Sequence, residues 1–241
     1  RLNQPFRKHA RTGLPLVVLK LALSLDGRTS TAPGDSPWIS GAESRELVHR
    51  WRAESDAIAV GIGTALADDP LLSARIDGAR QPLRVVFDSK ARLPLDSQLL
   101  RTLDQSPVLV VTAPDAPAER IEALRAAGAE LLVTTGIEPA LRDLGARDVT
   151  SLFLEGGRTL AAAFASADLI DESRTFIAPM LLGRQSDHAP RAGGVVGGTP
   201  SCTAGGGGSP AATGPARLAA LESSTESVGD DVLITARFKE W

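Results

Sequence analysis

The residues best suited to chemistry lie between positions 20 and 75, at the ends of apolar segments. Lys20 interrupts the apolar run LVVLKLAL, and a lysine inside a buried strand is costly unless it is paired or lines a cavity. Gly61-Ile62-Gly63-Thr64 closes a second apolar run, and an Asp68-Asp69-Pro70 turn leads to Arg75. Because binding groups concentrate in loops at the ends of elements, this region indicates a nucleotide-dependent enzyme site.

A second chemically suited segment, LFLEGGRT, begins with a strand-like run that ends at Glu155. A strand-end acid followed by two glycines commonly faces a ligand, and the alternative is an exposed carboxylate at a helix start. Residues 156–163 combine these glycines with a predicted helix N-terminus, whose N–H groups and dipole suit a pyrophosphate. The pattern is less specific than a full dinucleotide-binding fingerprint.

The elements that must position these groups alternate between strand and helix. A helix is predicted from Ser40 to Glu54, opened by a capping box of Ser40 and Glu43. The other predicted helices cover residues 117–127 and 138–144, and the strands cover residues 16–23, 56–61, 83–89, 107–112, 129–135 and 150–157. This alternation predicts an α/β fold with a mostly parallel central sheet, flanking helices and ligand loops at the carboxyl ends of the strands.

The C-terminal part follows another pattern, because residues 174–179, 217–225 and 230–238 read as strands without helices between them. We expect antiparallel strands that complete the sheet. The Gly-rich stretch at 184–214 is interpreted as a flexible loop or flap.

Composition restricts the function classes. The 241 residues suit one domain, and a net charge of −3 gives little support to nucleic-acid binding. Lone Cys202 and three scattered histidines (His9, His49 and His188) predict no metal site. The chain has no apolar run of membrane-spanning length and no signal peptide, so a cytoplasmic location without membrane contact is expected. Residues 1–14 are interpreted as a linker from an upstream domain, and residues 15–241 as the catalytic domain.

The motifs KLALSLDGRT, SPWIS, AIAVGIGTALADDPLLSAR, QPLRVVFDS, LFLEGGRTLAAAF and IAPMLLG occur together and in order. In this the chain resembles the reductase domain of bifunctional riboflavin-biosynthesis deaminase-reductases, which has a dihydrofolate-reductase-like fold. The zinc signature of the deaminase, H-x-E with P-C-x-x-C, is absent from the sequence, so the resemblance implies reduction only. It also implies a homodimer, paired with or fused to a deaminase domain.

The implied reaction is NADPH-dependent reduction of the ribosyl side chain of 5-amino-6-(5-phosphoribosylamino)uracil to the ribityl side chain. Hydride transfer to C1′ requires close contact between cofactor and substrate, together with a source of protons. Lys20 and Glu155 occupy the active-site positions of the family and suit proton transfer or stabilisation of a cationic imine. Which of the two residues does which is left open.

The resemblance also implies the residues that hold the cofactor. Trp38 would flank the nicotinamide, the alternative being that it pins a loop to the core. Arg92 would pair with the 2′-phosphate and select NADPH over NADH, the alternative being a solvated arginine. The cofactor-binding residues expected are Ala22, Trp38, Thr64, Asp68, Ser89, Arg92, Gly157, Arg158, Thr159, Leu160, Ala161, Ala162 and Ala163.

The substrate is expected to contact Ser36, Arg52, Leu72, Arg75 and Glu155, with the arginines binding its phosphate. Arg52 alternatively belongs to a solvated helix face, and Asp68 to a simple turn.

Two departures from the family pattern are Pro37 and Arg158, where a longer polar residue and a small residue or proline are usual. Two other functions are considered: a reductase of the same fold acting on a dihydropterin or another small substrate, and a non-catalytic NADPH-binding module. The paired arginines argue against the first, and the presence of Lys20 and Glu155 argues against the second.

Overall fold

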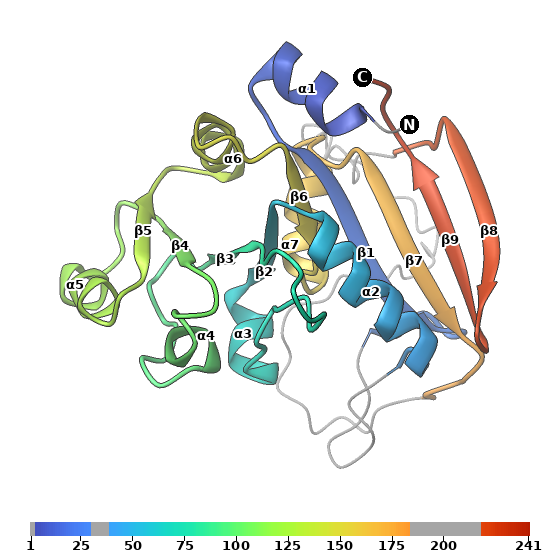
Figure 1. Ribbon diagram of the computed structural model, residues 1–241, viewed down its shortest axis with the longest axis horizontal. Coiled ribbons are helices and arrows are strands. Elements are labelled where there is room, and N and C mark those ends of the chain that lie inside the picture. Colours follow the sequence, from blue (N-terminus) through green and yellow to red (C-terminus); the bar gives the residue numbers. More distant parts are fainter. Residues whose placement is uncertain (1–2, 30–38, 184–217) are drawn as a thin grey trace, which may run out of the picture.

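The computed structural model describes residues 3–29, 39–183 and 218–241 (Figure 1). The Gly-rich stretch at 184–214, Ser36 and Trp38 lie outside these residues. One nine-stranded sheet organises the chain, in the order β5-β4-β3-β2-β6-β1-β7-β9-β8. Its strands are β1 (Leu16–Ser24), β2 (Ala57–Gly61), β3 (Leu83–Phe87), β4 (Val108–Thr112), β5 (Glu130–Val133), β6 (Ser151–Leu154), β7 (Glu172–Ala178), β8 (Glu222–Val228) and β9 (Asp231–Arg237).

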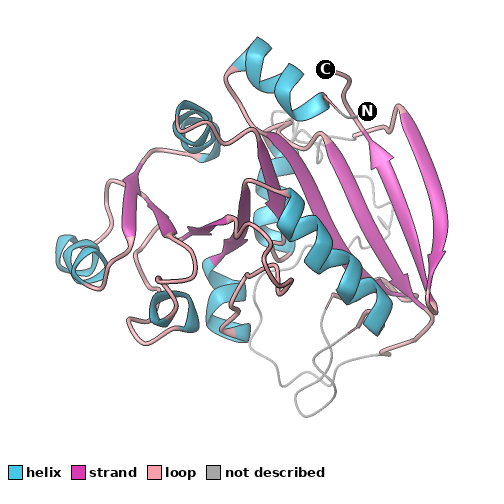
Figure 2. Ribbon diagram, in the orientation of Figure 1, coloured by secondary structure: helices cyan, strands magenta, loops and turns pink. Residues whose placement is uncertain are grey.

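Helices pack on both faces of this sheet (Figure 2). They are α1 (Gln4–Thr12), α2 (Ala42–Glu54), α3 (Ile62–Asp68), α4 (Gln98–Arg101), α5 (Ala118–Ala126), α6 (Ile137–Ala146) and α7 (Arg158–Ser166). One core packs residues of α2, α3, α4 and α5 against the sheet, and a second core packs residues of α6 and α7. The predicted α/β class with a mostly parallel sheet is confirmed.

The C-terminal strands correct one detail of the prediction. The pairs β7·β9 and β8·β9 are antiparallel, as expected, but β7 itself runs parallel to β1. The chain passes from β6 through α7 before entering β7, and a helical crossover of this kind returns the next strand in the same direction. Along the sheet, the first strand that runs antiparallel to its neighbour is therefore β9, and not β7 as the pattern of helices predicted.

The N-terminus of α2 corrects the predicted capping box. Gly41 is the N-cap residue, and no side-chain hydrogen bond of the capping-box type is present. Instead Asp231, at the start of β9, accepts hydrogen bonds from the Gly41 backbone N–H (2.7 Å) and the Ser44 hydroxyl (2.6 Å). The carboxylate that accepts hydrogen bonds at the start of α2 is thus 190 residues from Gly41 in sequence. The capping box predicts that neighbouring side chains fill this role.

Residues 4–12, within the segment interpreted as a linker, form helix α1, which packs on the domain. The Lys8 ammonium lies 2.6 Å from the Asp171 carboxylate, and both side chains are at most 2% exposed. Asp171 also accepts hydrogen bonds from the Val17 backbone (2.7 Å) and the Trp241 indole (2.9 Å). Burial lowers the pKa of Lys8, and the charge of Asp171 opposes that shift.

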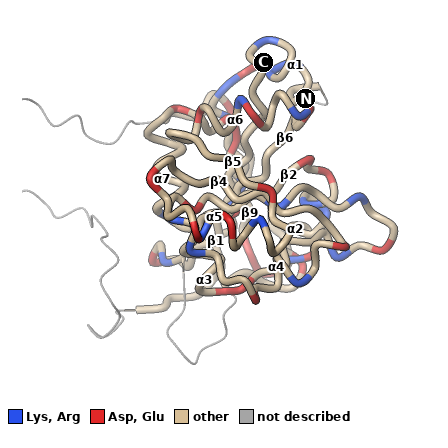
Figure 3. The backbone as a smooth tube through the Cα atoms, turned by 90° about the vertical axis from the view of Figure 1, so that its left-hand side faces the viewer, with Lys and Arg blue, Asp and Glu red and all other residues tan. Residues whose placement is uncertain are grey.

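Basic and acidic residues are interspersed over the described chain, and the view of Figure 3 shows no broad region of one sign. Among the described helices, none combines the length and apolarity needed to cross a bilayer.

Replacing Asp231 with alanine should remove both hydrogen bonds that hold the start of α2. We expect the free energy of unfolding to fall by about 2 kcal/mol, measured by urea denaturation. Asp230→Ala is the matched control, because Asp230 is exposed and a change there should stay within about 0.5 kcal/mol. Equal effects of the two substitutions would contradict the capping role.

Candidate active site

A cavity of about 820 Å³ opens beside the carboxyl-terminal halves of β1 and β2 and the end of β6. Parallel α/β sheets commonly bind ligands at this edge. Its wall is formed by Lys20, Leu21, Ala22, Thr29, Ile39, Ser40, Arg45, Val48, His49, Arg52, Val60, Thr64, Ala67, Asp68, Asp69, Pro70, Leu71, Leu72, Arg75, Gln98, Glu155, Gly156, Gly157 and Arg158.

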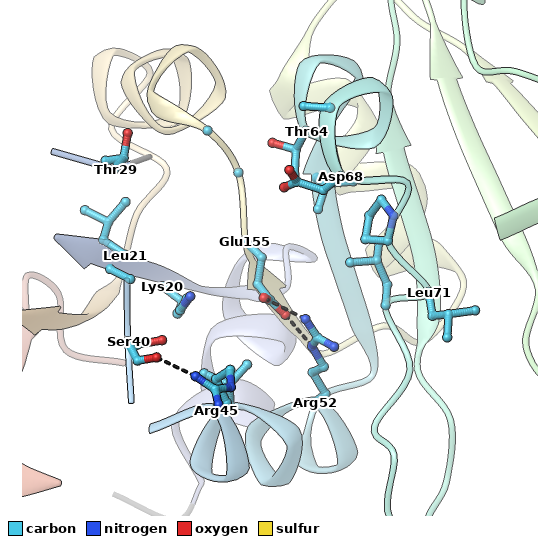
Figure 4. A pocket seen from close by; sticks show the side chains of 18 of the residues that line it. Lys20, Leu21, Thr29, Ser40, Arg45, Arg52, Thr64, Asp68, Leu71 and Glu155 are labelled. Carbon is cyan, nitrogen blue, oxygen red and sulfur yellow. Dashed lines mark hydrogen bonds and ion pairs between the residues drawn. The ribbon is translucent and has the colours of Figure 1, made fainter. Parts of the chain in front are cut away.

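Lys20 and Glu155 meet in this cavity because β1 and β6 are neighbouring parallel strands. Their register pairs Leu19 with Leu154, which makes the next residues, Lys20 and Glu155, lateral neighbours. The Glu155 backbone N–H donates to the Ala59 carbonyl (2.9 Å), so the segment stays attached to β2 beyond the end of β6. Figure 4 shows both side chains extending toward the same space.

Arg52, on α2, binds the Glu155 carboxylate through a two-point contact (Figure 4). Its Nε donates to Oε1 (2.6 Å) and its Nη2 to Oε2 (2.9 Å). Both side chains are nearly buried, at 12% and 10% exposure. Burial alone would raise the pKa of Glu155, but the Arg52 charge and hydrogen bonds, followed by the charge of Lys20, lower it below its usual value. Glu155 is therefore an ionised carboxylate at neutral pH.

The Lys20 side chain has no hydrogen bond or ion pair with any described residue, and Glu155 acts on it through charge. Burial lowers the pKa of Lys20; Glu155 raises it and Arg52 lowers it, with a net decrease. A lysine with a lowered pKa gives up a proton more readily than a solvated one.

The segment 69–75 forms another wall, and its backbone is left-handed at Asp69 (φ 38°), Leu72 (φ 53°) and Arg75 (φ 52°). Such conformations cost on the order of 1 kcal/mol at residues other than glycine and persist where the surroundings impose them. Leu72 is 2% exposed and anchors the segment. Arg75 is exposed and has no hydrogen bond or ion pair with any described residue, so its donors are available to a ligand.

Side chains from three other elements hold this segment. Gln98 of α4 donates its backbone N–H to the Asp69 carboxylate (2.8 Å) and its side-chain amide to the Asp69 carbonyl (2.6 Å). Buried Arg84 of β3 donates to the Leu71 carbonyl (3.3 Å). The Arg52 Nη1 donates a third hydrogen bond, to the Ser73 carbonyl (3.1 Å), and this bond links the segment to the ion pair with Glu155.

The predicted cofactor side lies where α3 and α7 begin. Gly157 is the N-cap of α7 and no side-chain hydrogen bond caps this helix, which begins with Arg158 at the cavity wall. A Cβ at Gly156 would lie 3.1 Å from the Leu160 Cβ, so only glycine fits comfortably against the helix. Thr64 of α3 borders Gly157, where an added Cβ would meet its hydroxyl at 3.4 Å. Asp68, one turn later, has a pKa raised by burial.

Ten of the predicted site residues line the cavity: Lys20, Ala22, Arg52, Thr64, Asp68, Leu72, Arg75, Glu155, Gly157 and Arg158. The predicted residues Ser89, Arg92, Thr159, Leu160, Ala161, Ala162 and Ala163 lie outside its lining. Arg92 is 57% exposed beyond β3, with its Nε 3.8 Å from the buried Asp88 carboxylate. Ala161, on α7, packs in the core between this helix and the sheet.

Sequence reasoning missed several polar residues of the wall, namely Thr29, Ser40, Arg45, His49, Asp69 and Gln98. Arg45, His49 and Arg52 lie four and three residues apart on α2, so helical periodicity counted back from Arg52 would have found the first two. Gln98 carried no such signal, since only the fold brings α4 to the Asp69 turn.

Residues 15–200 match the family model described as the RibD C-terminal domain. The riboflavin biosynthesis protein RibD of Actinobacillus pleuropneumoniae is 35% identical over 198 residues, which cover 80% of this chain and 52% of the relative. The chain therefore spans about half the length of this curated relative. The 2,5-diamino-6-ribosylamino-4(3H)-pyrimidinone 5′-phosphate reductase of Methanothermobacter thermautotrophicus is 41% identical over 175 residues, covering 70% of this chain and 80% of the relative.

Solved structures show the same architecture. RibD of Acinetobacter baumannii superposes with a TM-score of 0.73 at 30% identity, covering 99% of this chain and 62% of the other. The diaminohydroxyphosphoribosylaminopyrimidine deaminase/5-amino-6-(5-phosphoribosylamino)uracil reductase of Thermotoga maritima gives a TM-score of 0.71 at 25% identity, covering 98% and 60%.

Replacing Arg52 with methionine should reverse the pH dependence that Glu155 contributes to stability. In the unaltered protein the lowered pKa of Glu155 contributes stability above about pH 4.3, and this is lost as the pH falls through the folded pKa. Without Arg52, burial dominates, the pKa rises, and the variant loses stability as the pH increases from about 5 to 7. Urea unfolding at pH 7 should show a loss of about 3 kcal/mol, with a smaller loss at pH 5.

Arg50→Met is the control for this substitution, because Arg50 is exposed on the same helix. Its effect should stay within about 0.5 kcal/mol at both pH values. A loss in Arg52→Met that is independent of pH would show that the methionine disturbs packing without exposing an uncompensated carboxylate.

Proposed function

The chain belongs to the RibD C-terminal domain family, and we propose that it is the NADPH-dependent reductase of 5-amino-6-(5-phosphoribosylamino)uracil in riboflavin biosynthesis. The observation that carries this proposal is the pairing of Lys20 and Glu155 as neighbours in one cavity, beside the guanidinium groups of Arg52 and Arg75. A cation of lowered pKa, an ionised carboxylate and an anion-binding wall are what reduction of a phosphorylated imine requires.

A nicotinamide cofactor fits the residues present beside α3 and α7. The uncapped start of α7 offers N–H groups and a positive dipole end, and Arg158 adds a cation there. Gly156 and Gly157 leave room for a close approach to the backbone. When bound, the cofactor supplies the hydride that reaches C1′ of the sugar. Contacts of Ala22, Trp38, Thr64, Asp68, Ser89, Arg92 and residues 157–163 with NADPH, and preference for NADPH over NADH, are part of the proposal.

The chemical roles of Lys20 and Glu155 follow from their electrostatics. Reduction of the open, imine-like form of the sugar places a hydride on C1′ and a proton on the adjoining nitrogen. Glu155 is held ionised by Arg52, so it is a poor proton donor and suits stabilisation of the cationic imine. Lys20, whose pKa is lowered chiefly by burial, is assigned as the proton donor. Leu72 and Ser36 are proposed to hold the substrate.

A second substrate is favoured by one of the relatives. The protein from Methanothermobacter is named for reduction of the 2,5-diamino-pyrimidinone, a compound that still carries the amino group. Its 41% identity makes this compound the main alternative to the uracil. The homodimer, and pairing with a deaminase that would supply the uracil, remain predictions.

We expect the protein to oxidise NADPH when it is given 5-amino-6-(5-phosphoribosylamino)uracil. The substrate is generated by a separate deaminase, and the loss of NADPH is measured by its absorbance. Parallel reactions contain the undeaminated diamino compound, dihydrofolate or no substrate. Turnover of the uracil alone supports the proposal, and faster turnover of the diamino compound would favour the alternative. Turnover of dihydrofolate alone would identify a dihydropterin reductase and contradict the proposal. NADPH binding without any turnover would point to a non-catalytic binding module.

Lys20→Met should lower kcat by about 100-fold or more, because the proton donor is lost. The Kd for NADPH, measured by fluorescence, should change by less than about twofold, since the proton goes to the substrate nitrogen and not to the cofactor. Lys239→Met, which removes a lysine paired with Asp168 outside the cavity, is the matched control and should keep the normal kcat. Full activity of Lys20→Met would overturn the assignment.

A further inference from the structure

His49 is a cavity residue that the proposed chemistry does not use. It lies on the same face of α2 as Arg52, three residues earlier, and lines the cavity together with Arg52 and Arg75. Its Nδ1 is enclosed and has no hydrogen-bond partner in the described part of the chain. An enclosed ring nitrogen without a hydrogen-bond partner is unfavourable unless a ligand supplies that partner.

The charged groups that face His49 come from three elements: Arg52 from α2, Arg75 from the segment 69–75, and Glu155 from the end of β6. Burial lowers the pKa of His49, and the charges of Arg52 and Arg75 lower it further. A hydrogen bond to the Ser73 carbonyl and the charge of Glu155 act in the opposite direction without reversing the shift. The imidazole beside these two arginines is therefore neutral at pH 7.

We propose that His49 is a third phosphate-recognition group, which takes up a proton when the phosphate of the substrate binds between Arg52 and Arg75. The inference rests on the proposed function, because it assigns the cavity to a phosphorylated sugar. A phosphate monoester adds nearly two negative charges beside the ring, which outweighs the repulsion from the two guanidinium groups. The protonated ring then donates to a phosphate oxygen, and its unpaired nitrogen gains a partner.

The sign of the pH dependence follows from this coupling. The pKa of His49 lies below its ordinary value without the phosphate and is higher in the complex, so binding takes up a proton at pH values between the two. Affinity must therefore weaken as the pH rises through that interval. The phosphate itself is largely dianionic above about pH 6.5, so its own titration contributes little there.

The probe for the test is ribose 5-phosphate, with unphosphorylated ribose as the comparison. NMR titration should show the Kd for ribose 5-phosphate rising about tenfold between pH 6.5 and 8.5. The pKa of His49, obtained from the pH dependence of its ring chemical shift, should be higher in the saturated protein than in the free protein. His49→Asn, which keeps a neutral hydrogen-bonding side chain, should bind more weakly at pH 6.5 and show a change of less than about twofold over the same range.

His9→Asn is the matched control, because His9 contacts the Gly145 carbonyl (2.9 Å) from α1 and does not line the cavity. It should keep the pH dependence of the unaltered protein. The proposal is overturned if His49→Asn keeps that dependence, if the His49 signal does not shift in the unaltered protein, if ribose binds as well as its phosphate, or if ribose 5-phosphate does not bind. The two NMR observations on the unaltered protein hold even if His49→Asn fails to fold.

The turnover assay separates this proposal from the proposed function. Turnover of the ribosylaminouracil phosphate without pH-coupled binding would remove only the role of His49. Coupled binding of ribose 5-phosphate without turnover would keep the phosphate site and require a different sugar phosphate as the substrate.

Discussion

The site depends on the compensation of one buried carboxylate. Glu155 is withdrawn from water at the end of β6, and the two-point contact with Arg52, followed by the nearby charge of Lys20, favours its ionised form. A buried charge left unpaired would cost several kcal/mol, on the order of the stability of a whole domain. The surrounding elements must therefore hold their relative positions: α2 presents Arg52, β1 presents Lys20, and the Ser73 carbonyl of the segment 69–75 accepts a hydrogen bond from the Arg52 Nη1.

That constraint reaches beyond the cavity. The start of α2 is held by Asp231, on a strand near the far edge of the sheet, and the segment 69–75 is held by α4 and β3. Three left-handed residues in that segment show that its path is imposed by these contacts. The site is thus assembled by parts of the chain that contribute few side chains to its wall. The segment tied to Ser73 carries the exposed guanidinium of Arg75, so one set of contacts orders both the ion pair and the anion-binding wall.

The sequence predicted most of the architecture because its signals are local. Alternating apolar runs and helical segments marked the parallel sheet, and Lys20 and Glu155 stood out as charges within or directly after apolar strands. Interactions between distant residues left no such signal. The partner of Arg52 is 103 residues away, the carboxylate at the start of α2 is 190 residues from Gly41, and the left-handed turn at Asp69 depends on Gln98. The short helix α3 is not among the predicted helices, because its glycine and its small number of residues hide any period.

The contacts around Asp171 have a consequence for the order of the chain. Its carboxylate binds Lys8 near one end and the indole of Trp241 at the other, and the Trp241 backbone N–H donates to the Gln4 side chain (2.8 Å). Residues 237 positions apart in sequence are thus neighbours in space. Joining them through a short linker would carry only a small entropic cost of loop closure, so the fold is compatible with circular permutation. New ends could be opened at exposed Thr135 and Gly136, in the loop between β5 and α6, which do not line the cavity and do not contact the start of α2.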